Sequence, residues 1–155
     1  MKDPLLRLAK RIREECVELD RIVDRVGEGW LRAQESHDDL YVDSVALNLH
    51  GFYNGLERLF ELIATNIDGS LPEGANWHQV LLEQMAAEIP TKRPAVISDG
   101  MRDSLDEYRG FRHIVRNIYP FQFDAPKIQE IVARVPGVFS QVRAELLSFA
   151  DFLEQ

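Results

Sequence analysis

The residues best suited to chemistry lie between positions 109 and 119, in the sequence Arg-Gly-Phe-Arg-His-Ile-Val-Arg-Asn-Ile-Tyr. This stretch holds three arginines, one histidine and no acidic residue, whereas the whole chain has 18 basic and 26 acidic residues and a formal net charge of −8. Arginine presents a planar fork of donors that suits phosphate oxygens, and imidazole takes and gives protons near neutral pH. The net charge argues against a broad nucleic-acid-binding surface but leaves room for a small basic cleft.

On a helix, the polar residues of this stretch fall on one face, because they follow a spacing of three and four. The residues on that face are Arg109, Arg112, His113, Arg116 and Asn117. Phe111, Val115 and Ile118 fall on another side and can anchor the helix in a core. The sequence therefore predicts a helix that displays a row of hydrogen-bond donors, with Tyr119 at its end.

The stretch resembles the HEPN superfamily, and most closely its HepT-like toxins, whose motif is an arginine, four residues, a histidine, one residue and a tyrosine. The matching positions are Arg112, Asn117 and Tyr119, so an asparagine stands where the family has its histidine. The lead-in Phe111-Arg112-His113 is also similar to one branch of HepT-like proteins. Long helices in a matching order extend the resemblance to residues 1–155, as a single helical domain.

The resemblance implies a metal-independent endoribonuclease in which the ribose 2′-hydroxyl attacks the phosphodiester. In this scheme Arg112 stabilises charge on the phosphate, and the histidine position exchanges protons. Asn117 does not titrate, so His113 is the imidazole that could take over proton transfer. Arg112, His113 and Asn117 are the candidate catalytic residues, and Arg109 and Arg116 are the candidate phosphate-binding residues. No metal site and no cofactor are expected.

The resemblance also implies partners. HepT-like proteins commonly form homodimers in which the two motifs face a shared cleft, and they pair with a minimal nucleotidyltransferase that acts as the antitoxin. In some of these toxins the partner adenylylates the motif tyrosine, which corresponds to Tyr119. An added AMP would place an anion beside the arginines and keep RNA out of the cleft. A homodimer, a nucleotidyltransferase antitoxin and an RNA substrate are therefore expected.

Two other interpretations stay open. With Asn117 at the histidine position, the chain could be a catalytically silent HEPN module that binds a nucleotidyltransferase or a nucleotide. The arginines could also serve only in salt bridges, for which the expected partners are Glu57, Glu61, Asp103 and Glu107. Of the remaining histidines, His50 is expected to be solvated or hydrogen-bonded on the polar flank of a helix, and His78 to have a local role at a helix start.

The elements that must position these residues follow from apolar residues at helical spacing. The predicted helices span residues 5–30, 42–67, 77–85, 99–119 and 124–153. Ser98 or Asp99 can cap the helix that carries the motif, and Pro120 stops it. Pro136 falls inside the last span, where the preserved apolar phase favours one kinked helix over two.

Four long helices with short connections predict an all-α fold: an antiparallel four-helix up-and-down bundle with an extra short helix before the third long helix. The single cysteine, Cys16, excludes an internal disulfide and is expected to be a buried thiol. Lys2, Asp3 and Pro4 interrupt any N-terminal apolar run. No apolar stretch approaches the roughly 20 residues of a membrane span. A cytoplasmic protein without membrane contact is expected.

Overall fold

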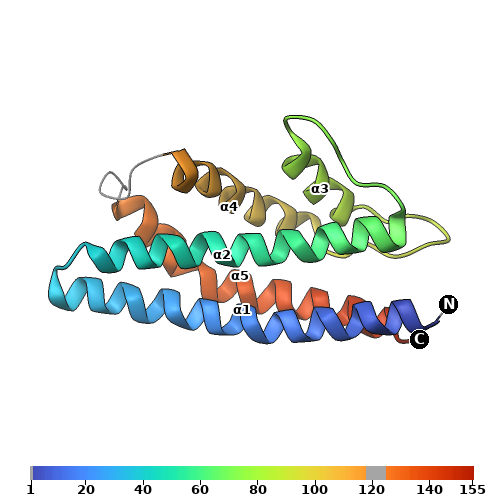
Figure 1. Ribbon diagram of the computed structural model, residues 1–155, viewed down its shortest axis with the longest axis horizontal. Coiled ribbons are helices and arrows are strands. Elements are labelled where there is room, and N and C mark those ends of the chain that lie inside the picture. The colour runs from blue at the N-terminus through green and yellow to red at the C-terminus, as the bar shows by residue number, and fades with distance from the viewer. Residues whose placement is uncertain (1, 118–124) are drawn as a thin grey trace.

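Every regular element in the residues that the computed structural model describes, 2–117 and 125–155, is a helix (Figure 1). The prediction of an all-helical protein is confirmed. The elements are α1 (Lys2–Ser36), α2 (Leu40–Ile63), the π-helical turn η1 (Ala64–Asp68), α3 (Trp77–Ala86), α4 (Asp99–Asn117) and α5 (Ala125–Leu153). None of the helices in these ranges is long and apolar enough to cross a membrane.

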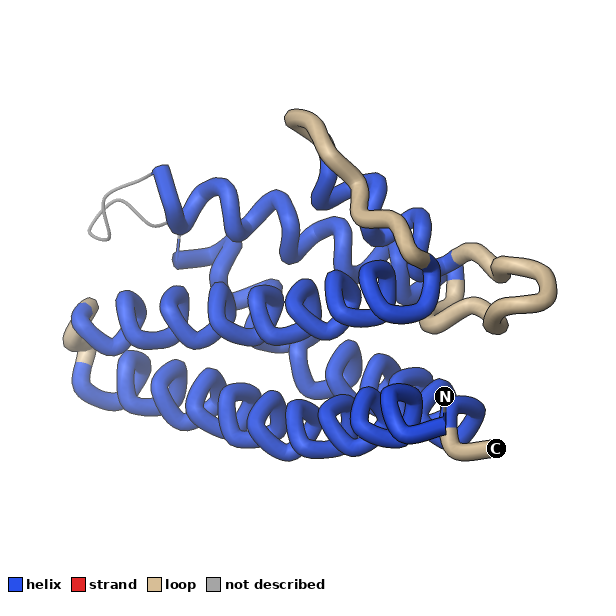
Figure 2. Tube along the Cα trace, turned by 45° about the vertical axis from the view of Figure 1, so that its right-hand side comes forward, coloured by secondary structure: helices blue, strands red, loops and turns tan. Residues whose placement is uncertain are grey.

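α1 and α2 form a long antiparallel hairpin, and α5 packs along α1 so that the two chain ends lie at the same end of the molecule (Figure 1). α4 packs against α2, and the short helix α3 packs against both α4 and α2. The two longest described connections, residues 69–76 and 87–98, flank α3 (Figure 2). α4 therefore lies beside α2 and α3, and α3 packs on the part of α4 that includes Arg102, Asp103 and Asp106.

The core forms where the predicted apolar stripes of the long helices meet. Cys16 is buried among them, as expected, at 2% exposure. The α1–α2 hairpin is closely packed, because a Cβ added at Gly55 would lie 2.8 Å from Cδ2 of Leu19. Farther along the hairpin, a Cβ at Gly29 would lie 3.1 Å from Cγ2 of Val45. The hairpin thus depends on small residues at two crossings.

Two predicted helix ends shift in the structure. α1 continues to Ser36, into the polar residues 34–39 that were expected to form a connection, and the ion pair of Arg32 with Glu28 supports its last turns. The α-helical part of α2 ends at Ile63, and the predicted remainder is a π-helical turn closed by Gly69 at φ 75°. α5 is continuous through Pro136, which confirms one helix over two. Its predicted first residue, Asp124, lies outside the described residues.

A buried ion pair holds the segment between α3 and α4. The side chain of Arg93 has 0% exposure and donates from Nε and Nη2 to the two carboxylate oxygens of Asp68, at 2.6 and 2.8 Å. Its other N–H groups bind the carbonyls of Gln84, Ala87 and Pro94. Burial disfavours the ionised carboxylate, but hydrogen bonds from Arg93 and Gln84 outweigh it and lower the pKa of Asp68.

Candidate functional site

The predicted motif lies at the end of α4. The helix continues through Asn117, so the backbone of Arg112, His113, Arg116 and Asn117 is helical, as expected. The side chains of these four residues lie outside the part of the chain that the structure describes. Tyr119 lies outside the described residues altogether. Their catalytic, phosphate-binding and modification roles therefore stay predictions.

The start of α4 is fixed by a cap and by a contact with α5. Oγ of Ser98 accepts a hydrogen bond from the backbone N–H of Met101 at 3.1 Å, which confirms the predicted cap. The backbone N–H of Ser98 donates to the Glu145 carboxylate at 2.5 Å. Farther along, Tyr108 packs edge-on against Phe52 of α2, with ring centroids 5.6 Å apart. These contacts set the rotation of α4 about its axis.

Arg109 follows Tyr108 on α4 and forms an ion pair within its own helix. Nε of Arg109 donates to Oδ1 of Asp106 at 2.6 Å, and the Arg109 side chain keeps 35% exposure. The hydrogen bond with Asp106 raises the pKa of Arg109, and the buried Tyr53 of α2 also acts on its charge. The salt-bridge interpretation thus holds for this one arginine, with a carboxylate that the sequence analysis did not choose.

Three of the carboxylates expected to pair with motif arginines have partners among the described side chains, whereas the side chains of Arg112 and Arg116 lie outside the described part of the chain. Asp103 pairs with the neighbouring Arg102, and Glu107 pairs with Arg134 of α5 at 2.9 Å. Glu57 pairs with a histidine of α3, as described next. The described contacts therefore link α4 to α5 and α2 to α3 through these carboxylates.

Glu57 and His78 form a partly buried acid–base pair between α2 and α3. Oε2 of Glu57 lies 2.7 Å from Nδ1 of His78, and the two side chains have 6% and 21% exposure. The ring of Trp77 packs on the imidazole, with centroids 3.6 Å apart and planes tilted by 34°. A carboxylate only accepts hydrogen bonds, so the proton of this hydrogen bond lies on Nδ1 of His78.

Sequence reasoning missed this pair. It expected His78 to have a local role, and the contact with Trp77 is local, but the bond to Glu57 joins residues 21 positions apart. One signal was present: Glu57 adjoins Leu56 in the apolar stripe of α2, and a carboxylate buried at such a position needs a partner. The sequence did not indicate which residue that partner would be.

The polar flank of α2 is a row formed by His50, Asn54, Glu57 and Glu61. Glu57 bonds to α3. Earlier in the row, Nδ1 of His50 lies 3.4 Å from Nδ2 of Asn54. Both are part-buried, which agrees with the hydrogen-bonded role expected for His50.

A cleft opens between α3 and α4 next to this row. Its walls come from the polar side of both helices: Gln79, Leu82, Glu83, Arg102, Asp103 and Asp106. Asp106 thus borders the cleft and also binds Arg109. Within the described part of the chain, no group of three or more His, Cys, Asp or Glu side chains is placed to hold a metal ion.

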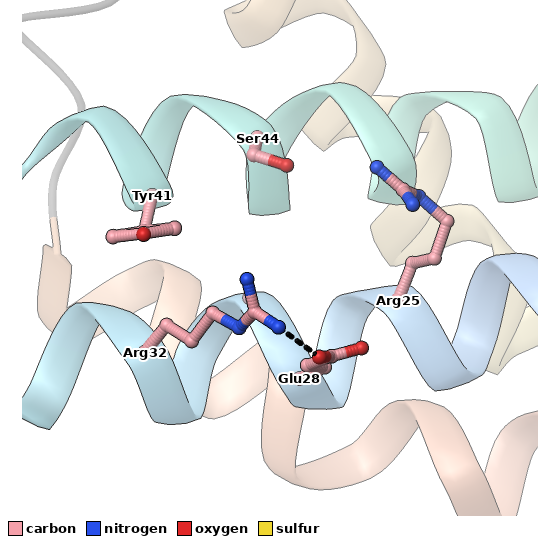
Figure 3. A pocket seen from close by; sticks show the side chains of 6 residues that line it. Arg25, Glu28, Arg32, Tyr41 and Ser44 are labelled. Atoms are coloured by element: carbon pink, nitrogen blue, oxygen red, sulfur yellow. Dashed lines mark hydrogen bonds and ion pairs between the residues drawn. The ribbon is translucent and has the colours of Figure 1, made fainter.

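A second polar groove lies between α1 and α2, where the side chains of Arg25, Glu28, Arg32, Tyr41 and Ser44 face one another (Figure 3). Glu28 pairs with Arg32 at 2.5 Å, and both side chains are more than half exposed. Gly29 lies in the same groove, at the close crossing with Val45. The groove is built from flexible surface side chains, unlike the buried contacts around Glu57.

The chain was compared with known protein families, curated proteins and solved structures. The family model described as HepT-like protein matches residues 44–153, which include α3, α4, α5 and most of α2. No curated protein and no solved structure matches the chain. The family match contains the predicted motif and also Glu57 and His78, whereas α1 lies outside it.

Proposed function

The chain belongs to the HepT-like protein family, and from that premise we propose that it is the toxin of a toxin–antitoxin pair and acts as a metal-independent endoribonuclease. The observation that carries this proposal is the family match over residues 44–153, which contains the cationic stretch in α4. The proposal takes residues 1–155 as one cytoplasmic domain. It also takes the four long helices as an antiparallel up-and-down bundle with α3 as the additional short helix.

The chemistry follows from the types of residue in the stretch. Arg112 stabilises the charge that develops on the phosphate, while Arg109 and Arg116 hold its oxygens. Asn117 orients the ribose or phosphate by hydrogen bonds, and His113 is the motif imidazole available for proton transfer. Supporting this arrangement, the Arg109 side chain remains about one third exposed. The ribose 2′-oxygen attacks phosphorus, and the bond to the 5′-oxygen breaks.

The partners follow from the family. HepT-like proteins generally work with a nucleotidyltransferase, and we place a nucleotidyltransferase antitoxin and a homodimer in this system. Adenylylation of Tyr119 by that antitoxin would put a phosphate anion beside the arginines and exclude RNA. Mass spectrometry of the toxin coexpressed with its antitoxin is expected to show one AMP adduct on Tyr119. An unmodified Tyr119 in a neutralised pair would contradict this mode of control.

The test of the proposed function is growth and total RNA after induced expression of the wild type and of Arg112→Ala. The wild type is expected to arrest growth and cleave RNA, and Arg112→Ala to do neither. The matched control is Arg21→Ala, because Arg21 is 73% exposed on α1 and pairs only locally with Glu18. Intact RNA and normal growth with folded wild-type protein would overturn the nuclease.

A catalytically silent binding module is the second candidate, and the observation that favours it is Asn117 at the position of the motif histidine. In that case the wild type binds a nucleotidyltransferase or a nucleotide without cleaving RNA. Asn117→His would then restore a titratable group and is expected to create cleavage. Wild-type cleavage would exclude this candidate directly.

A further inference from the structure

The polar groove between α1 and α2 contains more positive than negative charge. The guanidinium groups of Arg25 and Arg32 extend from α1 toward α2, and Glu28 is the acidic residue in the lining (Figure 3). Glu28 pairs with Arg32. Arg25 forms no ion pair with any side chain that the structure describes. Because arginine stays charged at neutral pH, the groove keeps one positive charge that the protein itself does not compensate.

The α2 side of the groove adds hydroxyl groups above a closely packed floor. Tyr41 and Ser44 both line it. Oγ of Ser44 accepts a long hydrogen bond from Nδ2 of Asn48, at 3.5 Å, so its O–H can still donate. The floor is the close crossing of Gly29 with Val45. The cavity measures about 160 Å³, and one water takes about 30 Å³, so a tetrahedral anion fits. Guanidinium and hydroxyl donors together suit phosphate oxygens.

The groove lies toward the same end of the molecule as the motif. α2 and α4 run in opposite directions, and Phe52 contacts Tyr108 between them (Figure 1). Tyr41 and Ser44 precede Phe52 by 11 and 8 positions, and the backbone of Asn117 follows Tyr108 by nine. At about 1.5 Å per residue, these positions lie roughly 12–17 Å from the contact, all in the same direction. The groove is therefore level with the end of α4, on the side of α2 that faces α1.

We propose that this groove is a second phosphate site, in which Arg25 and Arg32 hold a backbone phosphate of the RNA strand that the motif binds. The choice of RNA as ligand rests on the proposed endoribonuclease function. A strand carries a phosphate at every nucleotide, so it can reach the motif and the groove together. The acidic residues at the start of α2, Asp39 and Asp43, do not line the groove. Both arginines precede residues 44–153, so the site lies outside the part of α1 and α2 that the family match covers on its arginine side.

The first test measures binding of a labelled single-stranded RNA with 2′-methoxy groups, which attack by a 2′-hydroxyl cannot cleave. Fluorescence anisotropy over a series of salt concentrations compares Arg25→Gln with the wild type. The variant should bind roughly 2–5-fold more weakly, as expected for one exposed ion pair. Its dependence of log K on log salt should be shallower by roughly 0.7. Circular dichroism establishes that the variant is folded.

The control is Arg21→Gln, because Arg21 lies one turn earlier on α1, pairs with Glu18 and does not line the groove. Its salt dependence should equal that of the wild type. Equal changes in Arg21→Gln and Arg25→Gln would overturn the site, because the effect would then be the loss of any positive charge on α1.

Arg32→Gln should weaken RNA binding in the same direction as Arg25→Gln. Its matched control is Arg11→Gln, because Arg11 also pairs with a glutamate four positions away on α1. The two arginine side chains are 56% and 51% exposed. Unchanged binding in Arg32→Gln, or an equal loss in Arg11→Gln, would overturn the role of the second arginine.

The second test asks whether the groove holds the substrate that is cleaved. In steady-state cleavage of a long RNA, Arg25→Gln should raise KM and leave kcat unchanged, because the groove binds the strand away from the reacting atoms. A dinucleotide has a single phosphate, which the motif takes, so the wild type and Arg25→Gln should cleave it equally. A fall in kcat, or the same rise in KM for the dinucleotide, would overturn this role.

The outcomes separate this proposal from the one on which it rests. If the wild type cleaves no RNA but Arg25→Gln weakens RNA binding, the endoribonuclease proposal fails and the phosphate site stands. If the wild type cleaves and Arg25→Gln matches Arg21→Gln in salt dependence and KM, only the phosphate site fails. Titration with AMP identifies the source of the phosphate. AMP binding that depends on Arg25, with RNA binding that does not, would overturn RNA as the ligand.

Discussion

Two acid–base pairs connect the α2–η1 segment to later parts of the chain, and they differ in how completely they are enclosed. Arg93 and Asp68 have side-chain exposures of 0% and 1%, and Arg93 makes five hydrogen bonds with its five N–H groups. The pair of Glu57 with His78 buries the carboxylate but keeps 21% of the imidazole exposed. The first pair is saturated with hydrogen bonds and closed to solvent, whereas the second keeps one of its members in contact with solvent.

The largest effect is expected when the enclosed pair is broken. Arg93→Ala leaves the Asp68 carboxylate buried without its main partner, which should lower the free energy of unfolding by about 3–5 kcal/mol. Urea denaturation followed by circular dichroism measures this loss. Arg134→Ala is the control, because Arg134 and Glu107 are both more than half exposed, and its loss should stay below about 1 kcal/mol. Equal losses in the two variants would remove the distinction between an enclosed and an exposed pair.

The half-open pair should contribute less to stability than the enclosed pair. Glu57→Gln removes the charge but keeps an amide oxygen that can accept the hydrogen bond from His78, so the free energy of unfolding should fall by about 1–2 kcal/mol. Urea denaturation followed by circular dichroism measures this loss, and Glu18→Gln on the exposed side of α1 is the control. A loss as large as that of Arg93→Ala would show that the carboxylate of Glu57 depends on its partner as strongly as that of Asp68.

The enclosed pair should also appear in the pH dependence of stability. The pKa of Asp68 is lowered from its ordinary value of 3.8, so its stabilising contribution is present above that pH and is lost as pH falls through the lower, folded-state pKa. As the pH falls from roughly 4 to 2, the free energy of unfolding should decrease more steeply for the wild type than for Asp68→Asn. Urea denaturation at several pH values tests this, and parallel slopes would contradict it.

The helices could be predicted from the sequence because apolar spacing encodes burial directly. Leu105 and Phe111 are buried on α4 as their spacing predicts, and Ser98 caps that helix. The two acid–base pairs could not be predicted, because their members are 25 and 21 residues apart and meet only after the helices pack. Arg93 lies between prolines in a segment that reads as a loop, and nothing local indicates a buried role.

In the candidate site, too, the helix could be predicted from the sequence but the side-chain contacts could not. The helical conformation of the motif follows from local spacing, and α4 extends to Asn117. The contact of Arg109 with Asp106 is also local, because the two residues are three positions apart, yet the carboxylates expected to pair with it were on α2 and elsewhere on α4. The choice among nearby carboxylates depends on side-chain rotamers and on the rotation of α4, which Tyr108 and Ser98 set through tertiary contacts.

A smaller effect on stability is expected at the pair of Arg109 with Asp106, because this pair is more exposed than the pairs of Arg93 with Asp68 and of Glu57 with His78. Asp106→Asn should change the free energy of unfolding by less than about 1 kcal/mol, because both side chains are partly solvated at 35% and 43% exposure. It should nevertheless tighten RNA binding, because the carboxylate competes with phosphate for the guanidinium. One additional phosphate contact steepens the dependence of log K on log salt by roughly 0.7 for a single strand.

Fluorescence anisotropy of labelled RNA over a series of salt concentrations measures this slope. Asp99→Asn is the matched control, because it removes the same charge from the start of α4, where Asp99 pairs with Arg102. If both variants tighten binding equally, the effect is only the loss of a negative charge. A slope that steepens only in Asp106→Asn would identify Arg109 as a phosphate ligand that Asp106 occupies in the wild type. Arg93 differs, because all five of its N–H groups already donate hydrogen bonds within the protein.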